Sequence, residues 1–301
     1  MRIILIIPRI LWTIGVAWLT FVDWLGLLDI SPFPPIFYLV GSLGVFVFLD
    51  VGFWIYIIQT AGNWVVRIKY RKKMPSKSDY GCKVDYILPF NGEWTVFNGG
   101  ADAGMSHSWN IVSQRYAYDF IIMDNEGKSF DGDVKSLQSY YCYDKDIIAP
   151  ADGVVVKVSN KHRNSRVNGT KVFCDTWDIR GNFVIIKHAD GEFSVSAHLL
   201  PRSITVRKGD EVKQGQIIGK CGNSGNTSEP HLHFQLQSSK SFFLSAGLPI
   251  SFVNINAKEK VNYGLADTRG MLKEVLDAGN GRVHIGRGLE VSNYTTGVEH
   301  E

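Results

Sequence analysis

The residues of this 301-residue chain with the clearest chemical meaning are two histidines in the tripeptide His231-Leu232-His233. Residues i and i+2 of a β-strand project to the same face, so a strand here presents two imidazoles side by side. One imidazole can bind a metal ion while the other contacts a water or a substrate oxygen at that metal. Taken alone, the pair is also compatible with two surface histidines on a strand.

Three further residues supply what such a metal site needs. His198 ends the segment FSVSAHL, and His107 precedes a segment that carries Asp119. Two imidazoles and one carboxylate are a common ligand set for a catalytic zinc ion, which leaves one coordination position open for water. Zinc lowers the pKa of that water to about 7 and polarises a carbonyl, as amide hydrolysis requires. These residue types predict a Zn2+ site that hydrolyses peptide bonds.

The segments that position these residues have the length and composition of β-strands. Seven of them are rich in β-branched and aromatic residues and are separated by turn pairs such as Asp190-Gly191. Helical periodicity is nearly absent after residue 80, apart from a short predicted helix near Met271–Ala278. The pattern predicts a mostly β, antiparallel domain over residues 80–301. The predicted strands are VDYILPF (84–90), EWTVF (93–97), YAYDFIIM (116–123), GVVVKVS (153–159), NFVIIKH (182–188), FSVSAHL (193–199) and HFQLQ (233–237).

An ordered series of motifs carries a resemblance to a known family. The stretch GNFVIIKHADGEFSVSAHLLPRSITVRKGDEVKQGQIIGKCGNSGNTSEPHLHFQLQ, residues 181–237, resembles the catalytic core of the lysostaphin and LytM-type zinc metallopeptidases. APADGVVVKV at 149–158 and SHSWNIVSQRYAYDF at 106–120 extend the likeness upstream. Each motif is weak alone, but the ordered combination is highly specific. The resemblance implies a zinc endopeptidase that acts on the short cross-linking peptides of bacterial peptidoglycan.

The resemblance also implies a role for each of the five residues. His107, Asp119 and His233 correspond to the zinc ligands, and His198 and His231 to the pair that assists the attacking water and the oxyanion. Two alternatives remain open: an inactive module of the same fold that regulates a partner hydrolase, and a peptidase that acts on a non-wall peptide. Because all five positions are filled, catalysis is favoured.

The sequence departs from the family pattern in two places. Eleven residues separate His107 from Asp119, where the family has only a few. The extra segment WNIVSQRYAY is therefore predicted to loop out and return to the site at Asp119. A second insertion, Asn125–Lys145, is predicted to form a lid or a groove wall.

The first 66 residues are strongly apolar. Residues 10–28 and 36–59 are each long enough to cross a hydrocarbon core of roughly 30 Å, and neither has a polar face. The turn DISPFPP between them contains three prolines, which break a continuous helix. Residues 1–66 are therefore predicted to form a transmembrane helical hairpin, followed by a basic linker at 67–79. This predicts an integral membrane protein with two spans.

Charge bears on topology and on partners. The basic run RIKYRKK follows the second apolar segment, and the turn DISPFPP has no Lys or Arg, so the positive-inside rule places both ends in the cytoplasm. A substrate in the cell wall requires the opposite side, and the sequence leaves this conflict open. The predicted partners are a peptide substrate and the lipid bilayer. A net charge of only +3 provides no case for nucleic acid.

Overall fold

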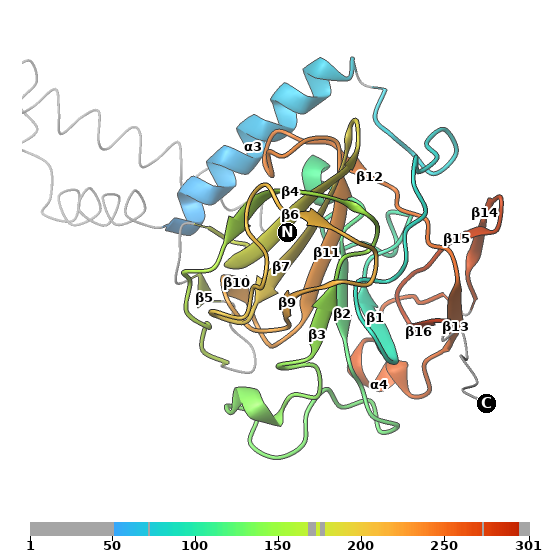
Figure 1. Ribbon diagram of the computed structural model, residues 1–301. Helices are drawn as coiled ribbons and strands as arrows, with labels where there is room; N and C mark the ends of the chain where they lie inside the picture. Colours follow the sequence, from blue (N-terminus) through green and yellow to red (C-terminus); the bar gives the residue numbers. More distant parts are fainter. Residues whose placement is uncertain (1–50, 72, 168–172, 175–177, 273, 295–301) are drawn as a thin grey trace, which may run out of the picture. The chain divides into compact units, whose positions relative to one another are not determined.

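The computed structural model describes residues 51–71, 73–167, 173–174, 178–272 and 274–294 (Figure 1). The chain divides into two units at Gln59, and the second unit, from Gln59 onward, contains the predicted site. Within the described residues this unit is built on a sheet of ten strands in the order β13-β16-β1-β2-β11-β7-β6-β4-β8, with β12 paired to β11. The named strands pair antiparallel throughout. The predicted mostly β, antiparallel fold is confirmed.

The elements have the following bounds. The helices are α3 (Val51–Lys69) and α4 (Tyr263–Ala266), with 3-10 turns η1 (Val112–Gln114) and η2 (Leu137–Ser139). The strands are β1 (Trp94–Asn98), β2 (Tyr118–Ile121), β3 (Asp146–Ile148), β4 (Gly153–Ser159), β5 (Phe173–Cys174), β6 (Asn182–Ala189), β7 (Glu192–Leu199), β8 (Glu211–Val212), β9 (Ile217–Lys220), β10 (Asn226–Thr227), β11 (Leu232–Gln237), β12 (Gly247–Leu248), β13 (Ile255–Glu259), β14 (Leu276–Gly279), β15 (Arg282–His284) and β16 (Leu289–Asn293).

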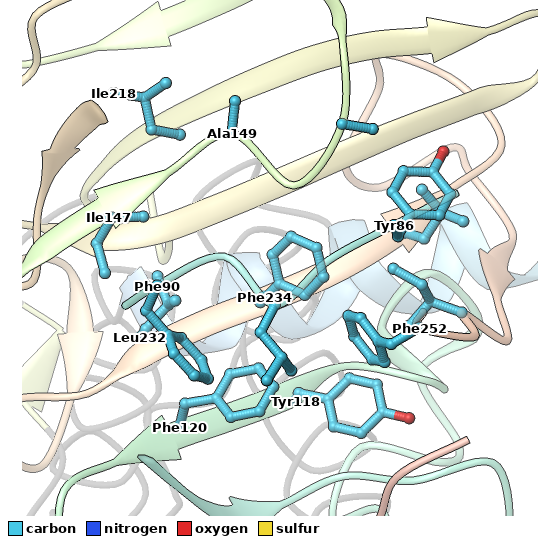
Figure 2. Packing of buried hydrophobic residues seen from close by; sticks show 14 of the residues in the cluster. Tyr86, Phe90, Tyr118, Phe120, Ile147, Ala149, Ile218, Leu232, Phe234 and Phe252 are labelled. Atoms are coloured by element: carbon cyan, nitrogen blue, oxygen red, sulfur yellow. The ribbon is translucent and has the colours of Figure 1, made fainter. Parts of the chain in front are cut away.

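The central strand β11 shows why the sequence forms this sheet. Its side chains alternate between two faces, and Leu232, Phe234 and Leu236 are all fully buried in the main hydrophobic core. Figure 2 shows Phe234 and Leu232 packed among aromatic rings from neighbouring segments, including Phe120 of β2. Burial of this apolar face fixes the register, because a shift of one residue would turn the apolar side chains to the other face.

Two segments differ from the predicted strands and helices. Residues 84–90 are not a strand but make isolated bridges, such as that between Phe90 and Ile147, since Pro89 lacks the N–H that a sheet ladder needs. The short helix predicted near Met271–Ala278 is also wrong. Leu276–Gly279 is strand β14, which pairs with β15 in a hairpin whose turn residues, Asn280 and Gly281, both have positive φ.

The prediction of an integral membrane protein with two spans is contradicted. The segment 10–28 lies outside the described residues, and only the end of 36–59 lies within them. Helix α3 does not end with the apolar run at Gln59 but continues to Lys69. In the described ranges, no helix combines the length and the apolar character that a membrane crossing requires.

The second half of α3 has contacts within the β domain that explain its extension. The side chain of Asn63 accepts a hydrogen bond from Val112 N (2.8 Å) and donates one to Asn110 O (3.3 Å). Val66 is buried and clusters with Val112 and Ala246. These contacts attach α3 to the segment between His107 and Asp119.

Candidate metal centre

Three neighbouring strands carry the central residues of the site. On β11, His233 pairs with Asp119 of β2 on one side and with Ala197 of β7 on the other. Directly opposed residues of an antiparallel pair have Cβ atoms about 4.5–5.5 Å apart. His231 lies two residues before His233, at the position that shares its face, and His198 follows Ala197 in β7. The sheet order therefore brings together four residues from three segments that are distant in sequence.

Asp119 lies at the centre of the cluster. Its Oδ1 is 3.0 Å from His233 Nδ1 and 3.7 Å from His231 Nε2. Its Oδ2 is 3.5 Å from His107 Nδ1. The ring centroid of His198 lies 4.7 Å from that of His231 and 5.7 Å from that of His233. All five residues singled out in the sequence lie in this cluster, and the eleven-residue segment returns the chain to Asp119 beside His107.

Backbone carbonyls set the orientation of two imidazoles. His198 Nδ1 lies 2.7 Å from Ser224 O, and His231 Nδ1 lies 2.8 Å from Glu229 O. A carbonyl oxygen only accepts hydrogen bonds, so both Nδ1 atoms carry the proton and donate. In the neutral rings, Nε2 is then the nitrogen with a free lone pair. His233 is turned the other way, with Nδ1 toward Asp119 and Nε2 toward Gln235 Oε1.

Burial and neighbouring charges set the protonation of the cluster. Burial acts to raise the pKa of Asp119, but His107, His233 and His231 outweigh it and hold that pKa far below its usual range. Asp119 is therefore a carboxylate. Burial, together with the nearby His231 and His233, lowers the pKa of His198 well below its ordinary value, so this ring is neutral near pH 7. Burial also acts to lower the pKa of His233, but the hydrogen bond and charge of Asp119 raise it overall.

The site has supporting residues that the sequence alone did not reveal. Asn98 of β1 is 5% exposed, and its Nδ2 donates to Asp119 Oδ2 at 3.2 Å.

The backbone of His198 has φ +61°, in the left-handed region that non-glycine residues rarely adopt, and its N–H donates to Arg180 O. Such strain is retained where the surrounding structure enforces it, and it is common at functional sites.

The second insertion, Asn125–Lys145, contacts the loop that precedes His231. Ser129 Oγ donates to Glu229 Oε2 (3.3 Å), and Cys142 Sγ donates to Pro230 O (3.1 Å). The insertion thus supports the turn whose Glu229 carbonyl orients His231. Its predicted role as a lid or groove wall stays a prediction.

The donor set has the chemistry of a zinc site. Among the described residues, no group of three or more His, Cys, Asp or Glu side chains already surrounds one point closely enough to hold a metal. The chemistry of the donors nevertheless fits, because an ionised carboxylate has three imidazole nitrogens within 3.7 Å. Imidazole and carboxylate ligands suit zinc, and small shifts of these side chains would bring their donor atoms together.

Comparison with known proteins gives matches over the core of the domain. Peptidoglycan DD-endopeptidase ShyA of Vibrio cholerae is 38% identical over 69 residues, 23% of this chain and 16% of ShyA. Murein hydrolase activator NlpD of Salmonella dublin is 33% identical over 132 residues, 44% of this chain and 30% of NlpD. The chain thus spans less than a third of either relative. The crystal structure of a zinc containing peptidase from Vibrio cholerae aligns over 55% of this chain and 39% of that one, with 20% identity and a TM-score of 0.33.

A family assignment follows from a separate match. Residues 137–243 match Peptidase family M23, a span that contains His198, His231 and His233 and begins after the segment with His107 and Asp119. Those three histidines lie in the motifs that carry the resemblance to the lysostaphin and LytM-type peptidases. Over residues 137–243 the chain therefore matches Peptidase family M23.

Proposed function

We propose that this protein is a zinc metalloendopeptidase that hydrolyses peptide bonds in peptidoglycan cross-links. The observation that carries the proposal is the convergence of His107, His231 and His233 on the ionised Asp119, with the ring of His198 beside those of His231 and His233. Backbone carbonyls orient two of these rings, those of His198 and His231. The M23 domain supports a peptidase, and the likeness to a protein named a peptidoglycan DD-endopeptidase supports the substrate class.

In this proposal His107, Asp119 and His233 hold the metal. A bound zinc ion supplies a Lewis acid that polarises the scissile carbonyl and lowers the pKa of a water molecule. Asp119 contributes the negative charge of the ligand set, and Asn98 restrains its second oxygen. His107 is the most accessible ligand, with 44% of its side chain exposed, so substrate would approach from its side of the cluster.

His198 and His231 then manage the protons. A neutral imidazole with a free Nε2 can accept a proton from the attacking water and return it to the leaving amine. Because Nδ1–H of each ring already donates to a backbone carbonyl, each ring is held in the correct tautomer, and that carbonyl stabilises the protonated form. A protonated ring beside the substrate also stabilises negative charge on the carbonyl oxygen.

Two substitutions separate metal binding from proton transfer. In His233→Ala, zinc content and hydrolysis are both lost, whereas His231→Ala keeps its zinc and loses hydrolysis. Metal analysis of the purified proteins and a muropeptide cleavage assay measure the two effects. His162→Ala, outside the cluster, is the control and retains both. Full activity of either site variant would overturn the assignment.

The match to NlpD supports a second candidate, a module that activates a separate murein hydrolase. The aligned region is nearly twice as long as that with ShyA, 132 against 69 residues. This candidate predicts that the purified protein leaves muropeptides intact and accelerates their cleavage only when a second hydrolase is present. It also predicts that His231→Ala does not impair that acceleration. Cleavage by the protein alone, abolished in His231→Ala, would exclude it.

A further inference from the structure

We propose that Gln235 is a positioning residue that accepts a hydrogen bond from His233 Nε2 and so holds the ring with Nδ1 toward Asp119, the side on which the metal would bind. The side chain of Gln235 is 1% exposed and lies on the same face of β11 as His233, two residues further along. Its Oε1 is 3.0 Å from His233 Nε2. The consequence for zinc rests on the proposed function, whereas the hydrogen bond itself does not.

The orientation of the Gln235 amide follows from its other contacts. Its Nε2 donates to Ser113 O (3.0 Å) and to Gln237 Oε1 (2.7 Å). Ser113 O is a backbone carbonyl that can only accept, so the NH2 group must face it and Oε1 must face His233. An amide oxygen there accepts a hydrogen bond, so the ring nitrogen opposite it carries the proton.

Gln237 extends this constraint to a second backbone carbonyl. Its Nε2 donates to Ser239 O at 2.7 Å, which leaves Oε1 as the group that faces Gln235. Both glutamines are fully buried. Rotation of either amide would place two buried oxygens against each other with no water to separate them, and buried polar groups without partners are costly.

The Ser113 carbonyl comes from the extra segment between His107 and Asp119. It belongs to η1, whose first residue, Val112, donates its N–H to Asn63 of α3. Gly247 of β12 allows the close approach, since a Cβ at this position would lie 3.0 Å from Ser113 O. The segment that departs from the family spacing therefore supplies an anchor for the amide that orients His233.

The effect on zinc follows from the general role of groups behind a metal ligand. A metal-bound imidazole usually donates its other N–H to an acceptor, which fixes the ring and raises its basicity. Loss of that acceptor typically lowers metal affinity about 10- to 100-fold. Without Gln235 Oε1, His233 Nε2 would lose its partner, and the ring would keep only the contact of Nδ1 with Asp119 Oδ1 at 3.0 Å to fix its orientation.

The test compares Gln235→Met with Gln237→Met. Both replace a buried glutamine on the same face of β11 with an apolar side chain of similar length. Only the first removes the acceptor of His233, because in Gln237→Met the Ser113 carbonyl still orients Gln235. We expect Gln235→Met to bind zinc about 10- to 100-fold more weakly in competition with a chelator. Gln237→Met should remain within about threefold of the wild type, since it leaves the metal ligand's acceptor in place.

Nitrogen NMR of 15N-labelled histidine gives a readout that does not depend on activity. The wild type and Gln237→Met should show a slowly exchanging proton on His233 Nε2, and Gln235→Met should not. Equal spectra and equal zinc affinity in all three proteins would overturn the inference, as would an equal loss in the two variants. If the wild type binds no zinc, the proposed function fails, and the Nε2 proton of the metal-free protein still decides the role of Gln235. Should Gln235→Met not fold, Gln235→Asn, whose shorter side chain withdraws the amide oxygen from His233 Nε2, should weaken zinc binding in the same direction. Unchanged binding in that variant would refute the inference.

Discussion

Replacing Gly225 with alanine tests the loop crossing that orients His198. At this crossing, Gly225 lies against the backbone of residues 179–181, next to the Ser224 carbonyl that faces His198. Gly225 has φ +87°, and a Cβ there would lie 2.4 Å from Gly181 N and 2.6 Å from Ile179 O. Both neighbours are backbone atoms, so no change of rotamer can relieve the overlap. The same crossing presents the Ser224 carbonyl that accepts the hydrogen bond of His198 Nδ1. The substitution should therefore move that carbonyl as well as destabilise the fold.

The expected loss has two parts. An alanine in the left-handed region costs about 1–2 kcal/mol. Overpacking against atoms that cannot move aside costs about 1–3 kcal/mol more. Gly225→Ala should thus lower the free energy of unfolding by about 2–5 kcal/mol. Gly92→Ala is the matched control, because Gly92 has φ +79° and a Cβ added there would meet nothing within 4 Å, so only the first cost applies.

Urea unfolding measures the difference between the two variants, which isolates the close approach at Gly225. Muropeptide cleavage without urea, at a temperature where both variants are folded, measures the effect on the site. Under the proposed function, Gly225→Ala loses turnover while it keeps its zinc, and Gly92→Ala loses neither. Equal destabilisation of the two proteins would refute the argument from the loop crossing.

Three further predictions address residues around the site and in the fold. Glu192 is fully buried and accepts two tyrosine hydroxyls and a backbone N–H, so Glu192→Leu should lower the free energy of unfolding by about 3 kcal/mol or more; an unchanged urea midpoint would contradict this. Asn98→Leu removes the hydrogen bond to Asp119. Under the proposed function, it should weaken zinc binding about tenfold or more in a chelator competition. A zinc affinity equal to that of the wild type would show that Asp119 needs no restraint. The guanidinium carbon of Arg180 lies 3.8 Å from the Phe183 ring centroid. Arg180→Lys should therefore lower the free energy of unfolding, measured by thermal unfolding, by about 1–2 kcal/mol. An unchanged free energy of unfolding would mean that the planar contact is unimportant.

The strands could be predicted where burial acts on one face of an alternating pattern. The run HLHFQLQ alternates polar and apolar residues, and β11 has that register with its apolar residues in the core. Segment 84–90, VDYILPF, was also predicted to be a strand from its apolar and aromatic residues but is not one. Its burial follows from hydrophobicity, whereas strand formation also needs a continuous ladder of N–H groups, which Pro89 interrupts.

Residues whose roles depend on pairing between distant strands were not predictable. Asn98 reaches Asp119 only because β1 pairs with β2, and nothing around Asn98 in the sequence marks it as part of a site. Gln235 and Gln237 did carry a signal. Two glutamines that continue the face of His233 on a strand would be buried with it, and buried amides need partners. That requirement is the sequence signal for a polar network behind the site, although the partners themselves emerge only from the fold.

The second half of helix α3 is in contact with the extra segment between His107 and Asp119. The apolar run 36–59 was predicted to be a membrane span because it is long and has no polar face, but helix α3 continues past it to Lys69. In the structure, Asn63 and Val66 of α3 bind and pack against the segment that continues to Ser113. Ser113 in turn anchors Gln235 behind His233. A change on α3 such as Asn63→Leu should therefore reach the candidate metal centre through three successive contacts, although α3 contributes no residue to the cluster.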